Sequence, residues 1–480
     1  MDTRVFDAFP RKIELAEAGL SARALRRMFE VVLEDELELN GLLLLRGGSL
    51  AFEHHVYPYR PDIPRMSFSM VEGFITTAVG LIVDQGLLDI DEKVVDIFPE
   101  HCPRDVSQHL SEMSVRHLLT SSTGHDMAAI SAANPMWLRD MSDNVVHHFL
   151  HFDVPYKPGE TLRYEPTHLV LASIVAKRSG CSAQQLLEKR LFRRVGMESV
   201  SWYEVGPDRL PMLVSATPLD YARFGLLLQN DGRWGDEQLI PESWVRDATS
   251  SQIDWPNATW LVGFGYFFGR LSFGGFEAAG DHGQRIYVIP EMDLVVVMTG
   301  TEPRDGRLFG VLVEMLRAID VDDGQPGDVS GLNDLLAEMN RPQHLAPWLP
   351  PCAREIDGTA YRFLPEQYFP PTRLALHFEG EDTFAVDFTN KRGLRDMFNG
   401  SLDGRFKIER LPPDNALGTG WRNQGTEVAM RGRWASERVF ECEVRPLSYG
   451  TCMRCTLTVG NDFVQLYCKH NRREETLIAQ

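Results

Sequence analysis

The sequence of 480 residues contains no apolar stretch close to the ~18 residues that a membrane-spanning helix needs. Its first residues, Met1 to Asp7, include no basic segment followed by an apolar one, so no secretory signal is predicted. Positively charged residues are fewer than negatively charged ones: the chain has 49 Lys and Arg residues and 68 Asp and Glu residues, for a formal net charge of −19. A surface this acidic repels phosphate backbones. We therefore expect a cytoplasmic protein with no membrane partner and no nucleic-acid partner.

Cysteine is also sparse. The seven cysteines are scattered along the chain, which suits a reducing compartment and argues against a disulfide framework. Cys452 and Cys455 have the spacing of half a zinc site, and Cys442 and Cys468 are conceivable further ligands. These residues fall in segments with strand character, where buried thiols are the simpler interpretation. We therefore expect no metal and no other cofactor.

The residues that are present indicate a globular chain with more than one domain. Hydrophobic residues make up 43% and charged residues 24%, which is the balance of a protein with a sizeable core. Helical and strand patterns mix up to about residue 320, and short alternating strands predominate beyond it. A polar stretch with Gly and Pro, Asp322 to Asp328, separates the two patterns. We predict a first domain over 1–320, a linker over 321–344 and a β-rich domain over 345–480.

Periodicity and turn residues predict individual elements. Helices are expected from Ser21 to Glu36, from Ser69 to Gly86 and from Thr167 to Ser179, the last closed by Gly180. A hairpin is expected over Leu42–Glu53 with its turn at Gly47 and Gly48. One antiparallel sheet should contain Gly263–Gly269, Arg285–Pro290 and Leu294–Thr299. The late strands are expected to build a small antiparallel barrel or sandwich: Tyr361–Phe363, Thr372–Glu379, Thr383–Thr389, Thr426–Trp434, Val439–Arg445, Cys455–Val459 and Phe463–Cys468.

A serine followed three residues later by a carboxylate opens the second of these helices. The spacing places Glu72 on the same helix face as Ser69, within reach of its hydroxyl. The free N–H groups of a helix N-terminus can also stabilise an oxyanion. Alone, the pattern is equally typical of a capping box, in which both side chains only satisfy the helix end.

Further motifs follow in a fixed order along the first 320 residues. They are Val115–His125 (VRHLLTSSTGH), Pro158–Tyr164 (PGETLRY), Thr217–Gly225 (TPLDYARFG) and Ala279–Pro290 (AGDHGQRIYVIP). Together with the segment around Ser69 and Glu72, they resemble the serine hydrolases of the β-lactamase and penicillin-binding-protein family, class C-like, which carry Ser-x-x-Lys at the start of such a helix.

The resemblance implies a fold and a site. The fold is α+β, with an antiparallel sheet flanked by helices and an all-helical lobe, and the domain over 345–480 is similar to the lipocalin-like appendage of some relatives. Ser69 falls at the nucleophile and Tyr164 at the catalytic tyrosine, and the backbone N–H groups of Ser69 and of the Gly283 strand would form the oxyanion hole. The residues expected to contact substrate are His125, Trp260, Asp281, Gly283 and Gln284.

Three positions depart from the family pattern. Glu72 stands where the family has Lys, and Pro166 stands where its tyrosine motif has an amide or hydroxyl side chain. The third motif has Asp281 where Lys or His is usual, followed by His282. Strand alternation would turn His282 to the opposite face unless the chain bulges there.

These departures leave three functional hypotheses. A carboxylate beside a phenol raises the pKa of the phenol, so Glu72 is expected to act as the base for Ser69 while Tyr164 donates a proton. The first hypothesis is acyl transfer, as ester or amide hydrolysis or transfer, on a small or peptidic metabolite. The second is a noncovalent acid–base enzyme (isomerase, cyclase or lyase) that uses Glu72, Tyr164 and His282. The third is an inactive ligand-binding descendant, and a homo-oligomer is left open.

Overall fold

The computed structural model describes residues 10–133, 144–255, 260–301, 306–320, 326–342, 344–365, 371–413, 415, 417, 425–461, 463–470 and 473–479. Its contacts divide the chain into two compact units that are interleaved along the sequence. The first unit consists of Met1–Ala18, Leu42–Glu53 and Met66–Met298, and the second of Gly19–Gly41, His54–Arg65 and Thr299–Gln480. The predicted segments 1–320, 321–344 and 345–480 stay a prediction.

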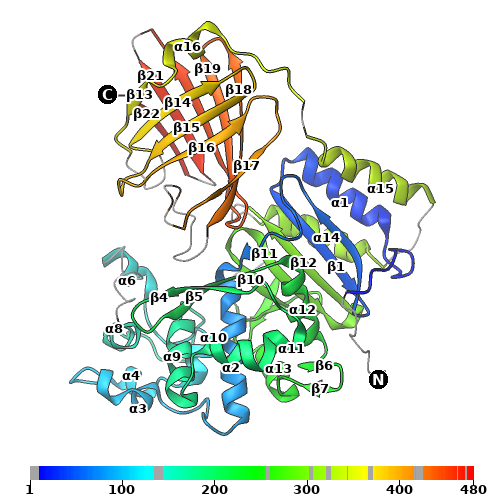
Figure 1. Ribbon diagram of the computed structural model, residues 1–480. Helices are drawn as coiled ribbons and strands as arrows, with labels where there is room; N and C mark the ends of the chain where they lie inside the picture. The colour runs from blue at the N-terminus through cyan, green and yellow to red at the C-terminus, as the bar shows by residue number, and fades with distance from the viewer. Residues whose placement is uncertain are drawn as a thin grey trace. The chain divides into compact units, whose positions relative to one another are not determined.

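A seven-stranded sheet forms the centre of the first unit (Figure 1). Its strands lie in the order β2-β1-β12-β11-β10-β9-β8, which brings an early strand, β1, beside the last one, β12. The strands from β8 to β12 pair antiparallel. The bounds are β1 Leu39–Arg46, β2 Ser49–His55, β8 Leu261–Phe264, β9 Gly269–Leu271, β10 Phe276–Gly280, β11 Gln284–Ile289 and β12 Leu294–Gly300.

Helices and two small sheets complete the first unit, and Figure 1 shows α3, α4, α8 and α9 gathered away from the seven-stranded sheet. The helices are α2 Val71–Asp84, α3 Val94–Ile97, α4 Gln108–Glu112, α5 Val115–Leu119, α6 Met127–Ala133, α8 Val145–His151, α9 His168–Ser179, α10 Ala183–Leu187, α11 Arg193–Val195, α12 Pro218–Gln229 and α13 Glu242–Thr249. One small sheet has the order β3-β5-β4 (Arg65–Met66, Leu210–Ala216 and Ser201–Val205), and the other pairs β6 (Arg233–Trp234) with β7 (Glu237–Gln238).

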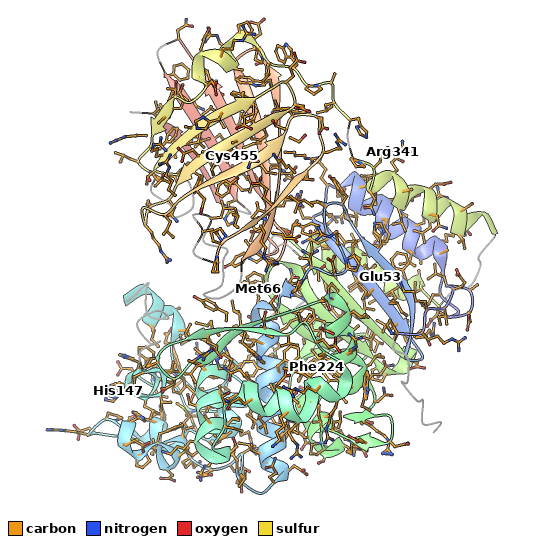
Figure 2. All side chains as sticks on the ribbon, in the orientation of Figure 1. Glu53, Met66, His147, Phe224, Arg341 and Cys455 are labelled. Atoms are coloured by element: carbon orange, nitrogen blue, oxygen red, sulfur yellow. The ribbon has the colours of Figure 1, made fainter. Side chains whose placement is uncertain are left out.

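Helix α2 lies in the core of the first unit, and this explains its composition. Twelve of its fourteen residues are buried, so it is apolar on all sides rather than on one stripe. Phe74 stacks on Phe224 of α12, labelled in Figure 2, with ring centroids 4.2 Å apart. Gly80 allows the Trp244 ring to approach, because a Cβ at this position would lie 2.3 Å from that ring. The helix is therefore fixed by packing on both sides.

The second unit combines three long helices with a curled sheet. Helix α1 (Ala22–Glu34) packs against α14 (Arg307–Ala318) and α15 (Pro326–Met339). A short helix, α16 (Pro351–Ile356), leads into the sheet. Helix α1 buries one face, and the Ser21 hydroxyl caps it by accepting a hydrogen bond from the Ala24 N–H.

Ten strands form the sheet of the second unit. The order is β13-β14-β15-β16-β18-β19-β20-β21-β22, with β17 paired to β18, so that β13 and β22 are the ends of the order. Adjacent strands pair antiparallel except β16 and β18, which meet in parallel at Ser401 and Arg431. The bounds are β13 Ala360–Arg362, β14 Arg373–Glu379, β15 Thr383–Thr389, β16 Arg395–Ser401, β17 Lys407–Leu411, β18 Thr426–Ser436, β19 Val439–Pro446, β20 Met453–Val459, β21 Val464–His470 and β22 Arg473–Ile478. The described strands thus form a curled half-barrel (Figure 1).

The structure confirms the α+β class and several predicted elements. Gly47 and Gly48 form the turn between β1 and β2 with φ of 60° and 73°, and Gly180 ends α9 with φ of 74°. The strand predicted over Gly263–Gly269 is wrong, because a tight turn after Gly265 separates β8 from β9. The predicted linker contains helix α15, whereas its first part, 321–325, lies outside the described residues.

Three cysteines lie side by side on neighbouring strands of the curled sheet. Cys455 faces Cys442 and Cys468 on the neighbouring strands, with 3.2 Å between Cys455 Sγ and Cys468 Sγ. Cys452 lies apart from them, against Glu443.

Across the described ranges, no helix is long and apolar enough to cross a membrane.

Phe74→Ala should lower the free energy of unfolding by about 3–5 kcal/mol, because it leaves a cavity beside Phe224 in a fully buried layer. Urea denaturation followed by tryptophan fluorescence measures this loss. Val106→Ala is the control, since Val106 is 41% exposed, and it should change stability by less than about 0.5 kcal/mol. Equal effects of the two substitutions would contradict the central position of α2.

Candidate active site

Ser69 lies in a short 3-10 turn, η1 (Phe68–Met70), which leads directly into α2. Met66, labelled in Figure 2, precedes the turn. Phe68 has φ of 48°, a conformation that a bulky residue rarely adopts, so the backbone is strained next to the serine. Two hydrogen bonds to the main chain of Val214 hold the segment. The Ser67 N–H donates to the Val214 carbonyl (2.7 Å), and the Ser67 hydroxyl accepts from the Val214 N–H (3.2 Å).

The end of strand β10 supports this turn from another direction. A Cβ on Gly280 would lie 2.0 Å from the Ser67 carbonyl oxygen and 3.2 Å from the Phe68 Cβ. Only glycine therefore allows β10 to approach the strained turn so closely.

Glu72 and Tyr164 form the polar centre of the site. The Tyr164 hydroxyl donates a hydrogen bond of 2.6 Å to Glu72 Oε1. Ser69 is close enough to the same phenol to lower its pKa, against the larger effects of burial and of Glu72, which raise it. Glu72 is only 4% exposed, and its burial raises the pKa of the carboxyl above the ordinary value of 4.5. Desolvation of the hydroxyl, together with the Glu72 charge, raises the pKa of Tyr164 well above 10. The Tyr164 ring is 45% exposed, so the site opens to solvent at this residue while the hydroxyl lies deeper.

His168 is a site residue that the sequence analysis missed. It is the first residue of α9, four positions after Tyr164, and its Nδ1 lies 3.6 Å from Glu72 Oε1. The ring is buried, and neither ring nitrogen has a hydrogen-bond partner within ordinary distance in the described structure. Spacing could not have identified it, because residues 164–167 are not helical and the approach of His168 to Glu72 depends on tertiary packing.

His125 belongs to a second buried group behind the tyrosine segment. Its Nδ1 lies 2.8 Å from the Thr123 hydroxyl and 3.4 Å from Glu165 Oε2, and the Thr123 hydroxyl donates to the same carboxylate (2.6 Å). The His125 ring is 0% exposed and meets Phe149 edge-on. This geometry favours a role in positioning the residue next to Tyr164 over the predicted contact with substrate.

The third motif forms a turn rather than a continuous strand. Asp281–Gly283 is a 3-10 turn between β10 and β11, and His282 has φ of 62°. Because the turn breaks the strand alternation, the His282 ring comes to lie 4.8 Å from the Phe68 ring, beside the serine segment. Asp281 is close enough to raise the pKa of both Glu72 and Tyr164. Gln284 is buried and donates to the His282 carbonyl (3.0 Å), which favours a structural role.

Trp260 lies just before β8, where its carbonyl accepts from the Ser272 N–H (2.8 Å). Burial raises the pKa of the Glu277 carboxyl, and the nearby Trp260 side chain opposes part of this effect. The role of Trp260 in substrate binding stays a prediction.

In the described part of the chain, no three His, Cys, Asp or Glu side chains are arranged to hold a metal ion.

The sequence of this chain matches a known protein family. The model of the family described as Beta-lactamase matches residues 40–308. The chain belongs to the beta-lactamase family. This membership confirms the predicted resemblance and places the chain among serine hydrolases.

Individual proteins are also similar to this chain in sequence or in structure. The chain is 22% identical over 322 residues to 6-aminohexanoate-dimer hydrolase of Paenarthrobacter ureafaciens, with 60% of this chain and 81% of that protein covered. A putative 6-aminohexanoate-dimer hydrolase from Bacillus anthracis matches in structure with a TM-score of 0.51 and 19% identity, over 59% of this chain and 79% of that one. EstCE1, a hydrolase with promiscuous acyltransferase activity, matches with a TM-score of 0.53 and 14% identity, over 64% and 98%.

Gly280→Ala should destabilise this beta-lactamase-family chain, because the added methyl group would displace the Ser67 carbonyl and the strained turn. We expect a loss of about 1–3 kcal/mol in thermal or urea unfolding. Gly310→Ala is the matched control: it lies inside α14 with no heavy atom within 4 Å of the new Cβ, so it should stabilise the chain by up to about 1 kcal/mol. A neutral Gly280→Ala would mean that the turn can move freely.

Proposed function

We propose that the chain catalyses acyl transfer, as hydrolysis or transfer of an ester or amide of a small or peptidic metabolite, with Ser69 as the nucleophile. The hydrogen bond between Tyr164 and Glu72, with Ser69 on the same phenol, is the observation that carries this proposal. The cytoplasmic location is part of the proposal and rests on composition.

The proton of Ser69 moves through the phenol. Tyr164 donates to Glu72. In the proposed mechanism it also accepts from the nearby Ser69, so the Ser69 proton passes to Tyr164 Oη while the tyrosine's own proton passes to Glu72 Oε1. The bond from Ser69 Oγ to the acyl carbon then forms without a free tyrosinate. When the bond to the leaving group breaks, the same path returns the proton to the departing oxygen or nitrogen.

Charge stabilisation compensates for the missing lysine. In this proposal the backbone N–H groups of Ser69 and of the Gly283 segment donate to the oxyanion. A proton on His168 would stabilise the Glu72 carboxylate across the 3.6 Å between Nδ1 and Oε1. The buried site thus replaces the lysine ammonium of the family with a carboxylate that accepts a proton, positioned by two neighbours.

The relatives favour ester and amide chemistry for the substrate. One similar protein is named for the hydrolysis of an amide dimer, and one solved structure of the same fold is a hydrolase with acyltransferase activity. Both reactions proceed through attack on an acyl carbon, which is the step that Ser69 is placed to perform.

A second candidate function is noncovalent acid–base catalysis. The observation that favours it is the carboxylate itself, because Glu72 with a raised pKa and the neutral Tyr164 form a proton-transfer pair without any help from Ser69. His282 lies beside Phe68 and completes the predicted set. An isomerase, cyclase or lyase would use these groups with Ser69 only binding the substrate.

A fluorophosphonate should add covalently to Ser69, and intact-protein mass spectrometry should show one adduct on the wild type and none on Ser69→Ala. Ser67→Ala is the matched control, because the Ser67 hydroxyl is already engaged with Phe68 and Val214, and it should still be labelled. An adduct that survives Ser69→Ala but is lost in Ser67→Ala would overturn the assignment of the nucleophile. A wild type that takes no label would move the proposal to the noncovalent mechanism.

The pH dependence of kcat/KM on p-nitrophenyl esters should show one acidic limb, with its midpoint above 4.5, the ordinary pKa of a Glu carboxyl. Glu72 accepts a proton only when ionised, so activity rises as the pH increases through its raised pKa. Tyr164 has a pKa well above 10 and stays protonated, so it adds no alkaline limb below that pH. Glu72→Gln and Tyr164→Phe should each lower kcat by about 100-fold or more.

The same substitution at Glu72 has a stability readout. A carboxyl with a raised pKa stabilises the folded state in its protonated form, and this contribution is lost as the pH rises through that pKa. Glu72→Gln resembles the protonated form, so its Tm at pH 8 should equal or exceed that of the wild type. A large fall in Tm together with lost activity would instead indicate that Glu72 serves the fold.

A further inference from the structure

Three cysteines form a row across the curled sheet of the second unit, and Cys455, labelled in Figure 2, is the middle one. It lies directly opposite Cys442 of β19 and directly opposite Cys468 of β21. The three side chains therefore share one face of the sheet. That face is the apolar core of the sheet, where Cys455 and Cys468 are buried and Cys442 is half-buried.

The spacing of the three thiols suits a disulfide. The sulfurs of Cys455 and Cys468 are 3.2 Å apart, which is a direct contact. Cys442 is also close to Cys455: the two neighbouring thiols, together with burial, raise the pKa of the Cys455 thiol well above the ordinary value of 9.0. Directly opposite residues of antiparallel strands have Cα atoms about 4.5–5.5 Å apart, inside the range of about 4.4–6.8 Å that a disulfide spans. Either neighbour can therefore bond to Cys455 without a shift of the strands.

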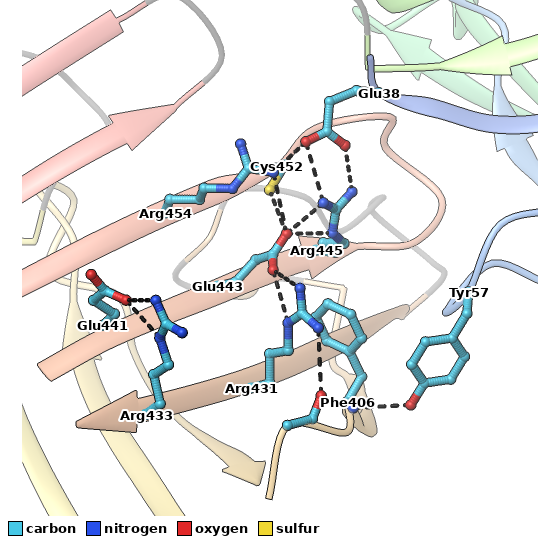
Figure 3. Close-up of polar contacts among 11 residues, drawn as sticks. Glu38, Tyr57, Phe406, Arg431, Arg433, Glu441, Glu443, Arg445, Cys452 and Arg454 are labelled. Atoms are coloured by element: carbon cyan, nitrogen blue, oxygen red, sulfur yellow. Dashed lines mark hydrogen bonds and ion pairs between the residues drawn. The ribbon is translucent and has the colours of Figure 1, made fainter. Parts of the chain in front are cut away.

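Ion pairs on the opposite face of the sheet hold the same strands in register (Figure 3). Glu443 accepts hydrogen bonds from Arg431 (2.7 Å) and Arg445 (2.7 Å), which links β18 to β19. Glu38 accepts from Arg445 (2.7 Å) and also pairs with Arg454 of β20. A slip of one residue would turn every side chain of a strand to the other face and would break these ion pairs. The thiols of the row therefore stay opposite one another.

Cys452 differs from the row, although it comes just before the same strand as Cys455. Its sulfur lies 3.4 Å from a carboxylate oxygen of Glu443, on the charged face drawn in Figure 3. Burial raises the pKa of this thiol. A thiol that is buried beside a carboxylate is a poor nucleophile, so we expect Cys452 to stay reduced.

We propose that the row is an oxidation site, at which hydrogen peroxide links Cys455 to one of its two neighbours by a reversible disulfide. Reaction begins at Cys442, the half-buried member of the row. Disulfides of cytosolic proteins are commonly transient in this way. The inference is independent of the proposed chemistry at Ser69.

The reaction balances in atoms and electrons. The Cys442 sulfur attacks one peroxide oxygen, the O–O bond breaks, and the products are a sulfenic acid and water. The Cys455 sulfur then displaces the sulfenic hydroxyl, which leaves as a second water with the Cys455 proton. The two thiols together lose two protons and two electrons, and peroxide takes them up to give the two waters. Cys468 can next displace Cys442 by thiol–disulfide exchange, which moves the S–S bond one strand along and passes a proton from Cys468 to Cys442.

Peptide mapping of the full chain tests this inference. The native protein is treated with a small molar excess of hydrogen peroxide, free thiols are blocked with N-ethylmaleimide in denaturant, and cross-linked peptides are identified by mass spectrometry. One disulfide that joins Cys455 to Cys442 or to Cys468 should form, with a mass loss of about 2 Da that dithiothreitol reverses. The inference is overturned if all three thiols stay free, if the disulfide joins any other pair, or if the row gains oxygen atoms without a disulfide. The map of the wild type alone decides between these results, so the test does not depend on the folding of a variant.

Single substitutions assign the roles within the row. Cys442→Ala removes the half-buried thiol and should slow disulfide formation at least about 10-fold, because only the two buried sulfurs remain. Cys468→Ala should still form the disulfide between Cys442 and Cys455. Cys102→Ala is the matched control, because Cys102 is also half-buried but lies in the first unit, and it should oxidise like the wild type. Equal rates for Cys442→Ala and Cys102→Ala would overturn the inference that reaction begins at Cys442.

Discussion

The buried carboxyl of Glu72 is the constraint on which the candidate site depends. A carboxylate removed from water is costly unless hydrogen bonds and charges replace its hydration. The phenol of Tyr164 and the imidazole of His168 replace this hydration. His168 is the first residue of α9, and Tyr164 lies four residues before it. In the proposed mechanism, the position of these two side chains determines where the Ser69 proton goes.

Strain and support are concentrated around the same turn. Phe68 adopts an unfavourable backbone conformation, and Ser67 is held by hydrogen bonds to Val214 and by the close approach of Gly280. Local strain of this kind persists only where surrounding contacts determine the conformation. Sites that break local rules in an otherwise consistent fold are the places where function is expected.

Much of the fold could be predicted from the sequence where one residue decides the local geometry. Ser21 as a helix cap, Gly180 as a helix end and the glycine pair after β1 each act through their own backbone or side chain. Helix α15 was missed because its Pro and Gly at the start resemble a linker, while its packing against α1 stabilises it. In the candidate site, helical spacing could predict that Ser69 and Glu72 share one face, and the family resemblance could predict Tyr164; the structure brings Tyr164 into contact with Glu72. The proximity of His168 to Glu72 and the burial of His125 depend on tertiary packing, which spacing does not determine.

The ion pairs between Glu38 and the arginines of β19 and β20 join residues that are more than 400 positions apart. The second unit combines residues 19–41 with residues 299–480, so it can be completed only after the strands of the curled sheet have left the ribosome. The first unit, by contrast, ends at Met298 and can form earlier. A gene fragment cut at the start of the curled sheet would therefore encode a sheet in which Arg445 and Arg454 lack the Glu38 carboxylate. Evolutionary exchange of this sheet as a separate module would face the same obstacle.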